Sequence, residues 1–324
     1  MPLKLFILDA TRTFGDEIAQ IGQFTVAEHE ERVFEDGEYK VRPLEAVAGC
    51  DVYVVQSLHA GPDASADEKL NRLLFFIGAL KDAGAAKIAA VTPYLCYARK
   101  DRRTKWQNPL TSRYVATLFE AVGTDAIVTM DVHNEAAFEN AFRCRTVALT
   151  AAPLFVEYAM SLSRENLCVI SPDPGGVKRA QLFREALEKA SGREVGRGYV
   201  EKRRSAGTVS GDILAGDIKD ATALIVDDLV ASGGTLQRAA QAARLAGARN
   251  VIALATHGLF MTGAAAMLSD NAIDRIAVTD IVAPFRLKED PVLKKIDVLS
   301  AAGLFAQAIR RLHQNLPLDD LLAY

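Results

Sequence analysis

The sequence predicts an α/β protein built from two mainly parallel sheets flanked by helices. Short apolar runs that suit buried strands alternate along the whole chain with longer stretches of helical periodicity. This alternation is typical of βαβ units, whose sheets are parallel. The chain has 324 residues, 50% of them hydrophobic, which is enough to bury two cores.

The elements follow one another in a regular order. The first strand is expected in the opening MPLKLFILDA, which is too short and too soon charged to be a signal peptide. Further strand-like runs lie at 52–56, 88–92, 126–130, 167–170, 223–226 and 251–255. Helical periodicity is found between these runs, at 67–83, 111–122, 152–163, 177–190 and 236–246.

The two halves of the chain resemble each other weakly, which suggests a duplicated domain. A strand ends in Asp-x-His at 127–133 and another ends in Asp-Asp at 225–228. We expect domains at 1–150 and 151–299, with a last helix at 300–313 that returns to the first half. Because no flexible Gly/Ser linker separates the halves, the two domains would have to pack tightly.

Composition excludes several classes of function. The net charge of −3 does not suit a nucleic-acid-binding protein, whose footprint is a basic domain. The four cysteines form no CxxC pair, so we expect reduced thiols rather than a metal site or disulfides. No stretch approaches the roughly 20 apolar residues of a membrane span. We therefore expect a cytoplasmic protein that does not bind a membrane.

The segment IVDDLVASGGT, residues 225–235, carries the most specific pattern. Asp227 and Asp228 end an apolar strand, and a turn of small residues at 231–235 leads into a helix. Adjacent acids at a strand end suit sugar hydroxyls or a bridging Mg²⁺. A helix N-terminus behind a glycine turn offers backbone N–H groups to an anion. The combination indicates a sugar-phosphate site, although ordinary loops can also combine Asp-Asp with Gly-Gly.

The segment FEDGE, residues 34–38, predicts a tight turn because a glycine stands between acids. It could be an exposed acidic loop. Alternatively, Phe34 stacks on a base while Asp36 and Glu38 accept hydrogen bonds from an adenine amine or a ribose.

The segment PYLCYARKDRR, residues 93–103, follows the strand at 88–92 and so leaves the carboxyl edge of a sheet, where α/β proteins bind ligands. Its basic residues could form a solvated face. The tyrosines before them favour the wall of a nucleotide site. Arg99 is then the expected phosphate partner, because a guanidinium donates hydrogen bonds in a fork.

Two further strand ends carry metal candidates. Asp131 and His133 stand two residues apart, so their side chains are expected to share a face and to hold Mg²⁺ or its water shell. A lone histidine could equally be structural. Asp173 follows the strand at 167–170, and Gly175-Gly176 open the next helix. Asp173 is either the cap of a Pro/Gly turn or part of a ligand site.

The segment EKRRSAG, residues 201–207, is a basic run expected in a mobile loop that extends to Gly216. Such a run is either solvated or closes over a nucleoside triphosphate and neutralises developing charge.

Six collinear motifs resemble the ribose-phosphate pyrophosphokinase family over almost the whole chain: FEDGE, YARKDRR, MDVHNE, SPDPGGVKRA, EKRRSAG and VDDLVASGGT. The resemblance implies two tandem type I phosphoribosyltransferase-like domains, each a mainly parallel sheet flanked by helices. It also implies transfer of the pyrophosphoryl group of MgATP to ribose 5-phosphate. Members of the family form homo-oligomers, so we expect a dimer or a multiple of dimers.

The resemblance also assigns a role to each motif. ATP would be bound by Phe34, Asp36, Gly37, Glu38, Arg99, Lys100 and Asp101. Ribose 5-phosphate would be bound by Asp227, Asp228, Ala231, Ser232, Gly233, Gly234 and Thr235. Mg²⁺ would be served by His133 and Asp173, and catalysis by Lys202 and Arg204. Part of the adenosine pocket would come from a neighbouring subunit.

Two departures from the pattern of the commonest class qualify this prediction. Ala231 and Ser232 stand where that class has Asp and Thr, so a carboxylate near the ribose is missing. The tail at 316–322 carries two acids in place of a serine-bearing segment that binds regulatory phosphate or ADP. Because acids repel an anion, we expect phosphate activation and ADP allostery to be absent.

Two alternatives remain open from the sequence. One is a related pyrophosphokinase with a different sugar phosphate or nucleotide donor, which Ala231 motivates. The other is a non-catalytic regulatory homologue, against which the presence of Lys202, Arg204, His133 and Asp173 argues.

Overall fold

The computed structural model describes residues 1–162, 166–205, 208–216 and 218–322, and of residues 201–205 and 208–213 it describes the backbone alone. The chain forms two compact units. Unit 1 comprises Met1–Thr150 together with the chain from Ala301, and unit 2 comprises Ala151–Ser300. Within the described part of the chain, every helix is too short or too polar to cross a membrane.

Unit 1 is built on a five-stranded sheet in the order β1-β4-β5-β6-β7, in which every neighbouring pair is parallel. Its strands are β1 (Leu3–Ile7), β4 (Asp51–Val55), β5 (Lys87–Val91), β6 (Ala126–Met130) and β7 (Arg145–Leu149). A separate antiparallel hairpin consists of β2 (His29–Val33) and β3 (Tyr39–Pro43). The carboxyl ends of the five parallel strands share one edge, and the loops that leave it after β5 and β6 carry Arg99, Lys100, Asp101 and His133.

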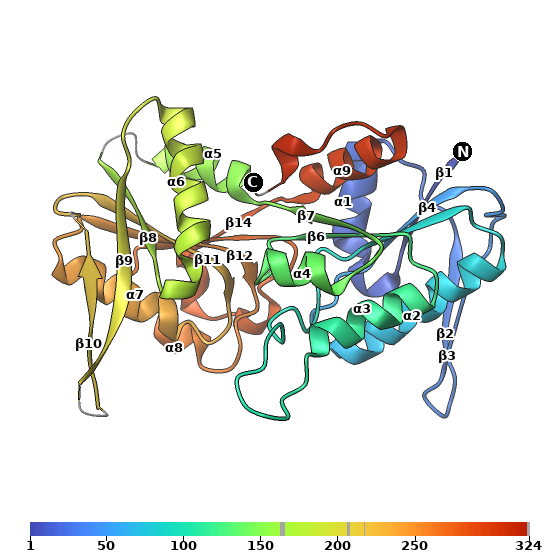
Figure 1. Ribbon diagram of the computed structural model, residues 1–324, viewed down its shortest axis with the longest axis horizontal. Helices are drawn as coiled ribbons and strands as arrows, with labels where there is room; N and C mark the ends of the chain where they lie inside the picture. Colours follow the sequence, from blue (N-terminus) through green and yellow to red (C-terminus); the bar gives the residue numbers. More distant parts are fainter. Residues whose placement is uncertain (163–165, 206–207, 217, 323–324) are drawn as a thin grey trace. The chain divides into compact units, whose positions relative to one another are not determined.

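Helices cover both faces of this sheet: α1 (Arg12–Gly22), α2 (Ala66–Asp82), α3 (Thr111–Ala121), α4 (Glu135–Ala141) and α9 (Ala302–Gln314). In Figure 1, α2 and α3 lie on one side of the sheet, and α1 and α9 lie together on the other. The Phe14 and Phe305 rings meet edge to face, with centroids 5.7 Å apart, and join α9 to α1. The last helix therefore packs within unit 1.

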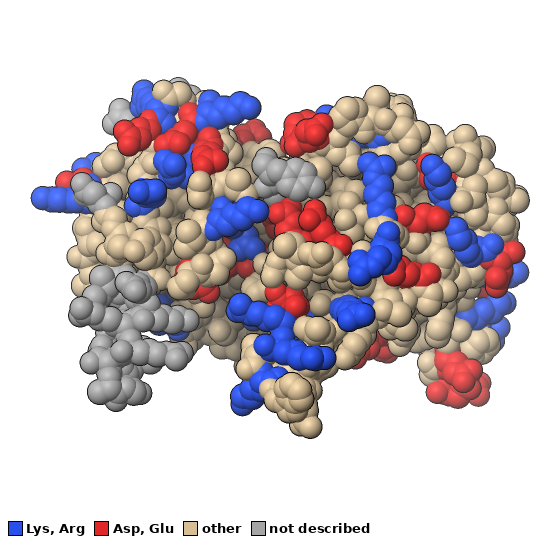
Figure 2. All heavy atoms as spheres, viewed as in Figure 1, with Lys and Arg blue, Asp and Glu red and all other residues tan. Residues whose placement is uncertain are grey.

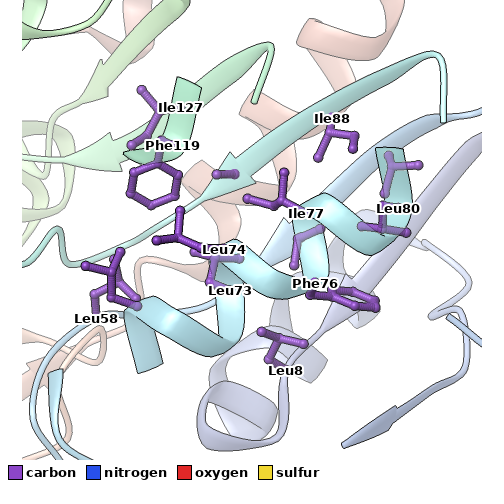
Figure 3. Close-up of a cluster of buried hydrophobic side chains, with 14 of the residues drawn as sticks. Leu8, Leu58, Leu73, Leu74, Phe76, Ile77, Leu80, Ile88, Phe119 and Ile127 are labelled. Carbon is purple, nitrogen blue, oxygen red and sulfur yellow. The ribbon is translucent and has the colours of Figure 1, made fainter. Parts of the chain in front are cut away.

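The core of unit 1 shows why α2 begins and packs where it does. A capping box starts the helix, since the Ser65 side chain accepts from the Glu68 backbone N–H and the Glu68 carboxylate accepts from that of Ser65. Its apolar face lies on the sheet, where Phe76 meets Phe6 edge to face at 5.1 Å between ring centroids. Figure 3 shows this cluster, with Leu73, Leu74, Phe76 and Ile77 of α2 facing side chains of the strands and of α3.

Unit 2 is built on a seven-stranded sheet in the order β10-β9-β8-β11-β12-β13-β14. Its strands are β8 (Leu167–Ser171), β9 (Gly196–Ser205), β10 (Thr208–Ala215), β11 (Thr222–Val230), β12 (Asn250–Gly258), β13 (Arg275–Thr279) and β14 (Ile296–Leu299). All neighbouring pairs are parallel except β9–β10. The flanking helices are α5 (Ala152–Leu162), α6 (Val177–Ser191), α7 (Gly234–Leu245) and α8 (Ala264–Leu268). Figure 1 shows α5 beside α6, and α7 beside α8.

Two expectations about local structure in unit 2 are wrong. The basic run expected as a loop lies in β9 up to Ser205, because β10 pairs with it antiparallel from Thr208↔Ser205 to Ala215↔Tyr199 and satisfies its backbone groups. Residues 206 and 207 lie outside the described residues. The strand expected at 223–226 runs on to Val230, because β12 continues to pair with it.

The C-terminal tail lies along β7. Leu322 forms an antiparallel bridge with Leu149, and the Thr150 N–H donates to the Leu321 carbonyl at 3.0 Å. Leu318 and Leu321 are buried. The tail thus covers part of the edge strand of unit 1, an edge that would otherwise offer unpaired backbone groups.

Candidate functional site

The acidic pair lies in the carboxyl-terminal half of β11, just beyond its last pairing with β8. β11 pairs with β8 only as far as Ile225↔Ile170, whereas its pairing with β12 continues to Val230↔Gly258. Asp227 and Asp228 are therefore placed where one neighbouring strand has already turned away. This is the position at which parallel sheets bind ligands.

The two carboxylates share one cation from α6. Nη1 of Arg179 is 3.4 Å from Oδ1 of Asp228 and 3.7 Å from Oδ1 of Asp227. The Asp228 side chain is 4% exposed and that of Asp227 is 20% exposed. The Asp228 N–H also donates to Oδ1 of Asp227 at 2.9 Å. The pair is thus a set of carboxylate oxygens in a nearly buried position, with only a narrow exposed face.

Burial raises the pKa of the Asp227 carboxyl to about 8, and the neighbouring Asp228 adds to this rise. Arg179 acts in the opposite direction, because its positive charge favours the ionised form. At neutral pH the pair therefore holds a proton more readily than an exposed aspartate does.

The loop after β11 is fixed by its backbone. Gly233 has φ +81°, which favours glycine, and a Cβ on it would lie 3.0 Å from Cδ2 of Leu268, so a side chain there would also crowd Leu268. The Met261 N–H donates to the Ala231 carbonyl at 2.9 Å. α7 begins at Gly234, and its N-cap residue Gly233 has no side chain to cap it. The first backbone N–H groups of α7 are therefore suited to an anion such as a phosphate.

Asp173 caps the turn after β8. Its Oδ1 accepts from the Gly175 N–H at 2.9 Å and from the Gly176 N–H at 3.1 Å. The capping alternative drawn from the sequence is thus realised. A metal at this position could be ligated only through the other carboxylate oxygen without loss of the cap. The side chains of Lys202 and Arg204 lie outside the described residues.

In unit 1 the basic loop between β5 and α3 is anchored by short-range bonds. Tyr97 has φ +60° and its hydroxyl donates to Asp67. The Lys100 N–H donates to the Tyr97 carbonyl at 2.9 Å, and the Ser112 hydroxyl donates to the Lys100 carbonyl at 3.0 Å. Arg99 and Lys100 are exposed, and Figure 2 shows Lys and Arg side chains gathered over this loop, at the lower middle of the view. The loop backbone is held while its cations face solvent.

The loop after β6 is joined to the basic loop. The Asn134 side-chain amide donates to Oδ2 of Asp101 at 2.7 Å, and its Oδ1 accepts from the Ala137 N–H at 3.1 Å, which caps α4. The structure thus connects the predicted ATP residue Asp101 with the loop that carries His133. The expectation that Asp131 and His133 share a face by strand alternation is wrong, because β6 ends at Met130 and Asp131 has φ +40°.

The hairpin tip between β2 and β3 forms the tight turn expected from FEDGE. Gly37 has φ +88°, the Gly37 N–H donates to the Phe34 carbonyl at 3.0 Å, and the Phe34 N–H donates to the Glu38 carbonyl at 2.9 Å. The Arg32 guanidinium lies 5.1 Å from the Phe34 ring centroid. Among the residues that the structure describes, no hydrogen bond or ion pair joins the tip to residues 99–101.

Comparison with known proteins decides the family. The chain is 36% identical to the ribose-phosphate pyrophosphokinase of Caldanaerobacter subterraneus subsp. tengcongensis, over 98% of this chain and 97% of that protein. It is 35% identical to the protein of the same name from Vibrio parahaemolyticus, over 96% of each chain. The chain belongs to the ribose-phosphate pyrophosphokinase family.

Two other comparisons agree with this assignment to the ribose-phosphate pyrophosphokinases. Residues 3–123 match the family described as the N-terminal domain of ribose phosphate pyrophosphokinase, and residues 199–322 match the phosphoribosyl synthetase-associated domain. The crystal structure of phosphoribosylpyrophosphate synthetase from Mycobacterium smegmatis superposes with a TM-score of 0.85 at 31% identity, covering 97% of this chain and all of that one. The family resemblance and the α/β fold expected from the sequence are confirmed.

Two residues that belong to the quoted motifs MDVHNE and SPDPGGVKRA, but were assigned no role from the sequence, lie against the predicted site residues of this pyrophosphokinase homologue. Arg179 pairs with both acids, and Asn134 binds Asp101. The sequence signal for Arg179 is weak, because it is one basic residue near the start of a helix behind Gly175-Gly176. Its partners are 48 and 49 positions further along the chain, and only the fold brings them together.

Proposed function

We propose that the protein transfers the β,γ-pyrophosphoryl group of MgATP to the C1 hydroxyl of ribose 5-phosphate, giving phosphoribosyl pyrophosphate and AMP. The observation that carries this proposal is the pair Asp227–Asp228 beside a glycine phosphate loop, at the carboxyl edge of a parallel sheet, in a chain of this family. The C1 oxygen attacks the β-phosphorus, the bond from that phosphorus to the oxygen shared with the α-phosphorus breaks, and AMP leaves with that oxygen.

The ribose side of the reaction lies in unit 2. The 5-phosphate would be held by the backbone N–H groups of residues 231–235 at the start of α7. The carboxylate oxygens of Asp227 and Asp228 that carry no proton would accept hydrogen bonds from ribose hydroxyls. Ala231 and Ser232 contribute through their backbone, since the Ala231 side chain has no polar atom.

The ATP side lies in unit 1. Arg99 and Lys100 would contact the phosphates, because both side chains are exposed on an anchored loop. Asp101 would hold that loop in position through its hydrogen bond with Asn134. Phe34, Asp36, Gly37 and Glu38 would bind adenosine from the hairpin tip. Since the tip is joined to residues 99–101 by no hydrogen bond or ion pair within the described residues, we propose that it serves the site of a neighbouring subunit in a homo-oligomer.

The side chains of the two metal candidates, Asp173 and His133, suit Mg²⁺ to different degrees. Asp173 has one carboxylate oxygen outside its capping bonds, and Mg²⁺ is commonly bound by one or two carboxylates together with substrate phosphates and water. His133 suits the water shell better than direct ligation, because Mg²⁺ prefers oxygen ligands. When bound, the ion would neutralise phosphate charge and orient the phosphate oxygens. Lys202 and Arg204 would stabilise the oxygens of the group in transit as fixed positive charges.

We also propose that inorganic phosphate does not activate the enzyme, although the structure changes the reason. Asp320 is paired with Arg311, with Nη2 and Oδ2 3.0 Å apart, and the bond to Arg311 lowers the pKa of Asp320. Arg311 largely offsets the negative charge of Asp320, so Asp319 is the main residue left to repel a regulatory anion. A tail that already supplies a carboxylate to Arg311 leaves that cation less available to a regulatory anion.

We place the enzyme in the cytoplasm.

AMP release from MgATP, with and without ribose 5-phosphate and at zero and high phosphate, tests these proposals. We expect AMP release that depends on ribose 5-phosphate and proceeds without added phosphate. If other sugar phosphates or nucleoside triphosphates give higher kcat/KM, the alternative substrate that Ala231 suggests is correct. If nucleotide binds but no AMP forms with any acceptor, the chain is a regulatory homologue. A strict requirement for millimolar phosphate would refute the absence of activation.

A further inference from the structure

Arg179 lies against the acid pair, although the sequence assigned it no role within the motif SPDPGGVKRA. It stands in the first turn of α6, on the strand–turn–helix that follows β8, while its two partners belong to β11. A single nitrogen, Nη1, lies within 4 Å of both carboxylates. The Arg179 side chain is 26% exposed and the Asp228 side chain 4%. The contact is therefore largely shielded from water.

The charge at this point requires a cation. The two carboxyl groups lie close together in a nearly buried place, where the Asp228 N–H donates to the Asp227 carboxylate, and burial disfavours a negative charge on either group. Arg179 places a positive charge beside the pair and opposes the rise in the pKa of Asp227 that burial causes. A guanidinium cannot lose its proton at any physiological pH, so this compensation is permanent.

The state of the pair decides what it can bind. An ionised carboxylate accepts hydrogen bonds on both oxygens, whereas a protonated one donates through its hydroxyl and loses part of its acceptor capacity. A sugar hydroxyl that donates to the pair needs a carboxylate oxygen that carries no proton and faces the ribose. The Asp228 oxygen that faces Arg179 and the Asp227 oxygen that accepts from the Asp228 N–H are already engaged, so Arg179 also sets the orientation of both side chains.

We infer that Arg179 is a positioning residue for ribose 5-phosphate, holding the Asp227–Asp228 pair oriented toward the ribose hydroxyls without itself contacting the transferred group. The inference rests on the proposed function, because it assumes that this pair binds the ribose. It predicts a defect in binding of the sugar phosphate and no defect in binding of ATP.

The variants R179Q and R179K test this, with R184Q as the matched control. Arg184 lies on the same helix and is ion-paired with Glu188 instead, so R184Q removes an equal charge from α6 away from the acids. We expect R179Q to raise KM for ribose 5-phosphate at least tenfold while KM for ATP stays within twofold of wild type. R179K, which keeps the charge but not the fork, should recover part of that loss. R184Q should match wild type in both constants.

The outcomes separate this inference from the proposed function. If wild type shows AMP release that depends on ribose 5-phosphate and R179Q leaves its KM unchanged, the inference is overturned and the function stands. A fall in kcat with unchanged KM would also overturn it, since Arg179 would then act on the transferred group. If wild type releases no AMP and a calorimetric titration shows no binding of ribose 5-phosphate, the proposed function fails first. Should R179Q not fold, R179K decides: a raised KM for ribose 5-phosphate alone supports the inference, and unchanged constants refute it.

Discussion

The clearest energetic consequence of the acid pair concerns stability against pH. The pKa of the Asp227 carboxyl is raised from its ordinary 3.8 to about 8, because the side chain is buried next to Asp228. Between these values the native pair keeps one proton that the unfolded chain has lost. A raised folded-state pKa gives a contribution to stability that is full at low pH and is lost as pH rises. Asp227→Asn removes this dependence.

The expected magnitude follows from linkage. One proton bound by the native state but not by the unfolded chain changes the free energy of unfolding by about 1.4 kcal/mol per pH unit. From pH 5 to pH 7 the stability of D227N relative to wild type should therefore rise by about 3 kcal/mol at most. Acids away from the pair titrate alike in both proteins and cancel in the difference.

Urea unfolding followed by far-ultraviolet circular dichroism, on protein free of ligand and metal at pH 5, 6 and 7, measures this difference. The matched control is Asp220→Asn, the same change at an exposed position of unit 2. The D220N difference should stay flat across the range. If the D227N difference is equally flat, the pair holds no proton at neutral pH and the reasoning from its burial is wrong.

Three further substitutions probe the other parts of the site. Lys202→Ala should lower kcat at least a hundredfold, about 3 kcal/mol of barrier, while calorimetry still detects ribose 5-phosphate binding; unchanged turnover would remove Lys202 from the mechanism. Gly233→Ala should destabilise unit 2 by about 2–4 kcal/mol, because alanine is strained at a φ of +81° and its Cβ would lie 3.0 Å from the Leu268 side chain. The control Gly192→Ala has φ +67° but open space, so an equal loss in both variants would show that the clash is immaterial. Asn134→Ser keeps a capping oxygen for α4 but cannot reach Asp101, and should raise KM for ATP roughly fivefold, about 1 kcal/mol; an unchanged KM would show that the Asp101 bond does not hold the ATP loop.

Most elements were predictable because parallel strands buried on both faces are continuous apolar runs. The strand expected at 126–130 and the helix expected from Thr111 appear at those positions. The errors arose where pairing between distant segments decides the outcome. β11 extends to Val230 because β12 continues beside it, and the run 201–205 is a strand because β10 returns along it. Neither partner can be identified from the local composition of the run itself.

The sequence by itself determined the fold class, the family and the identity of the candidate site residues. Strand periodicity, glycine turns and the individual motifs are local properties that can be recognised within about ten consecutive residues, and the order of the motifs is read directly along the chain. The tertiary structure alone decided how those residues are partnered. It placed Arg179 against acids 48 and 49 positions away, bound Asn134 to Asp101, and gave Asp320 to Arg311. Charge compensation and burial depend on distances in space, and for this reason the protonation of the acid pair and the role of Arg179 could be inferred only from the fold.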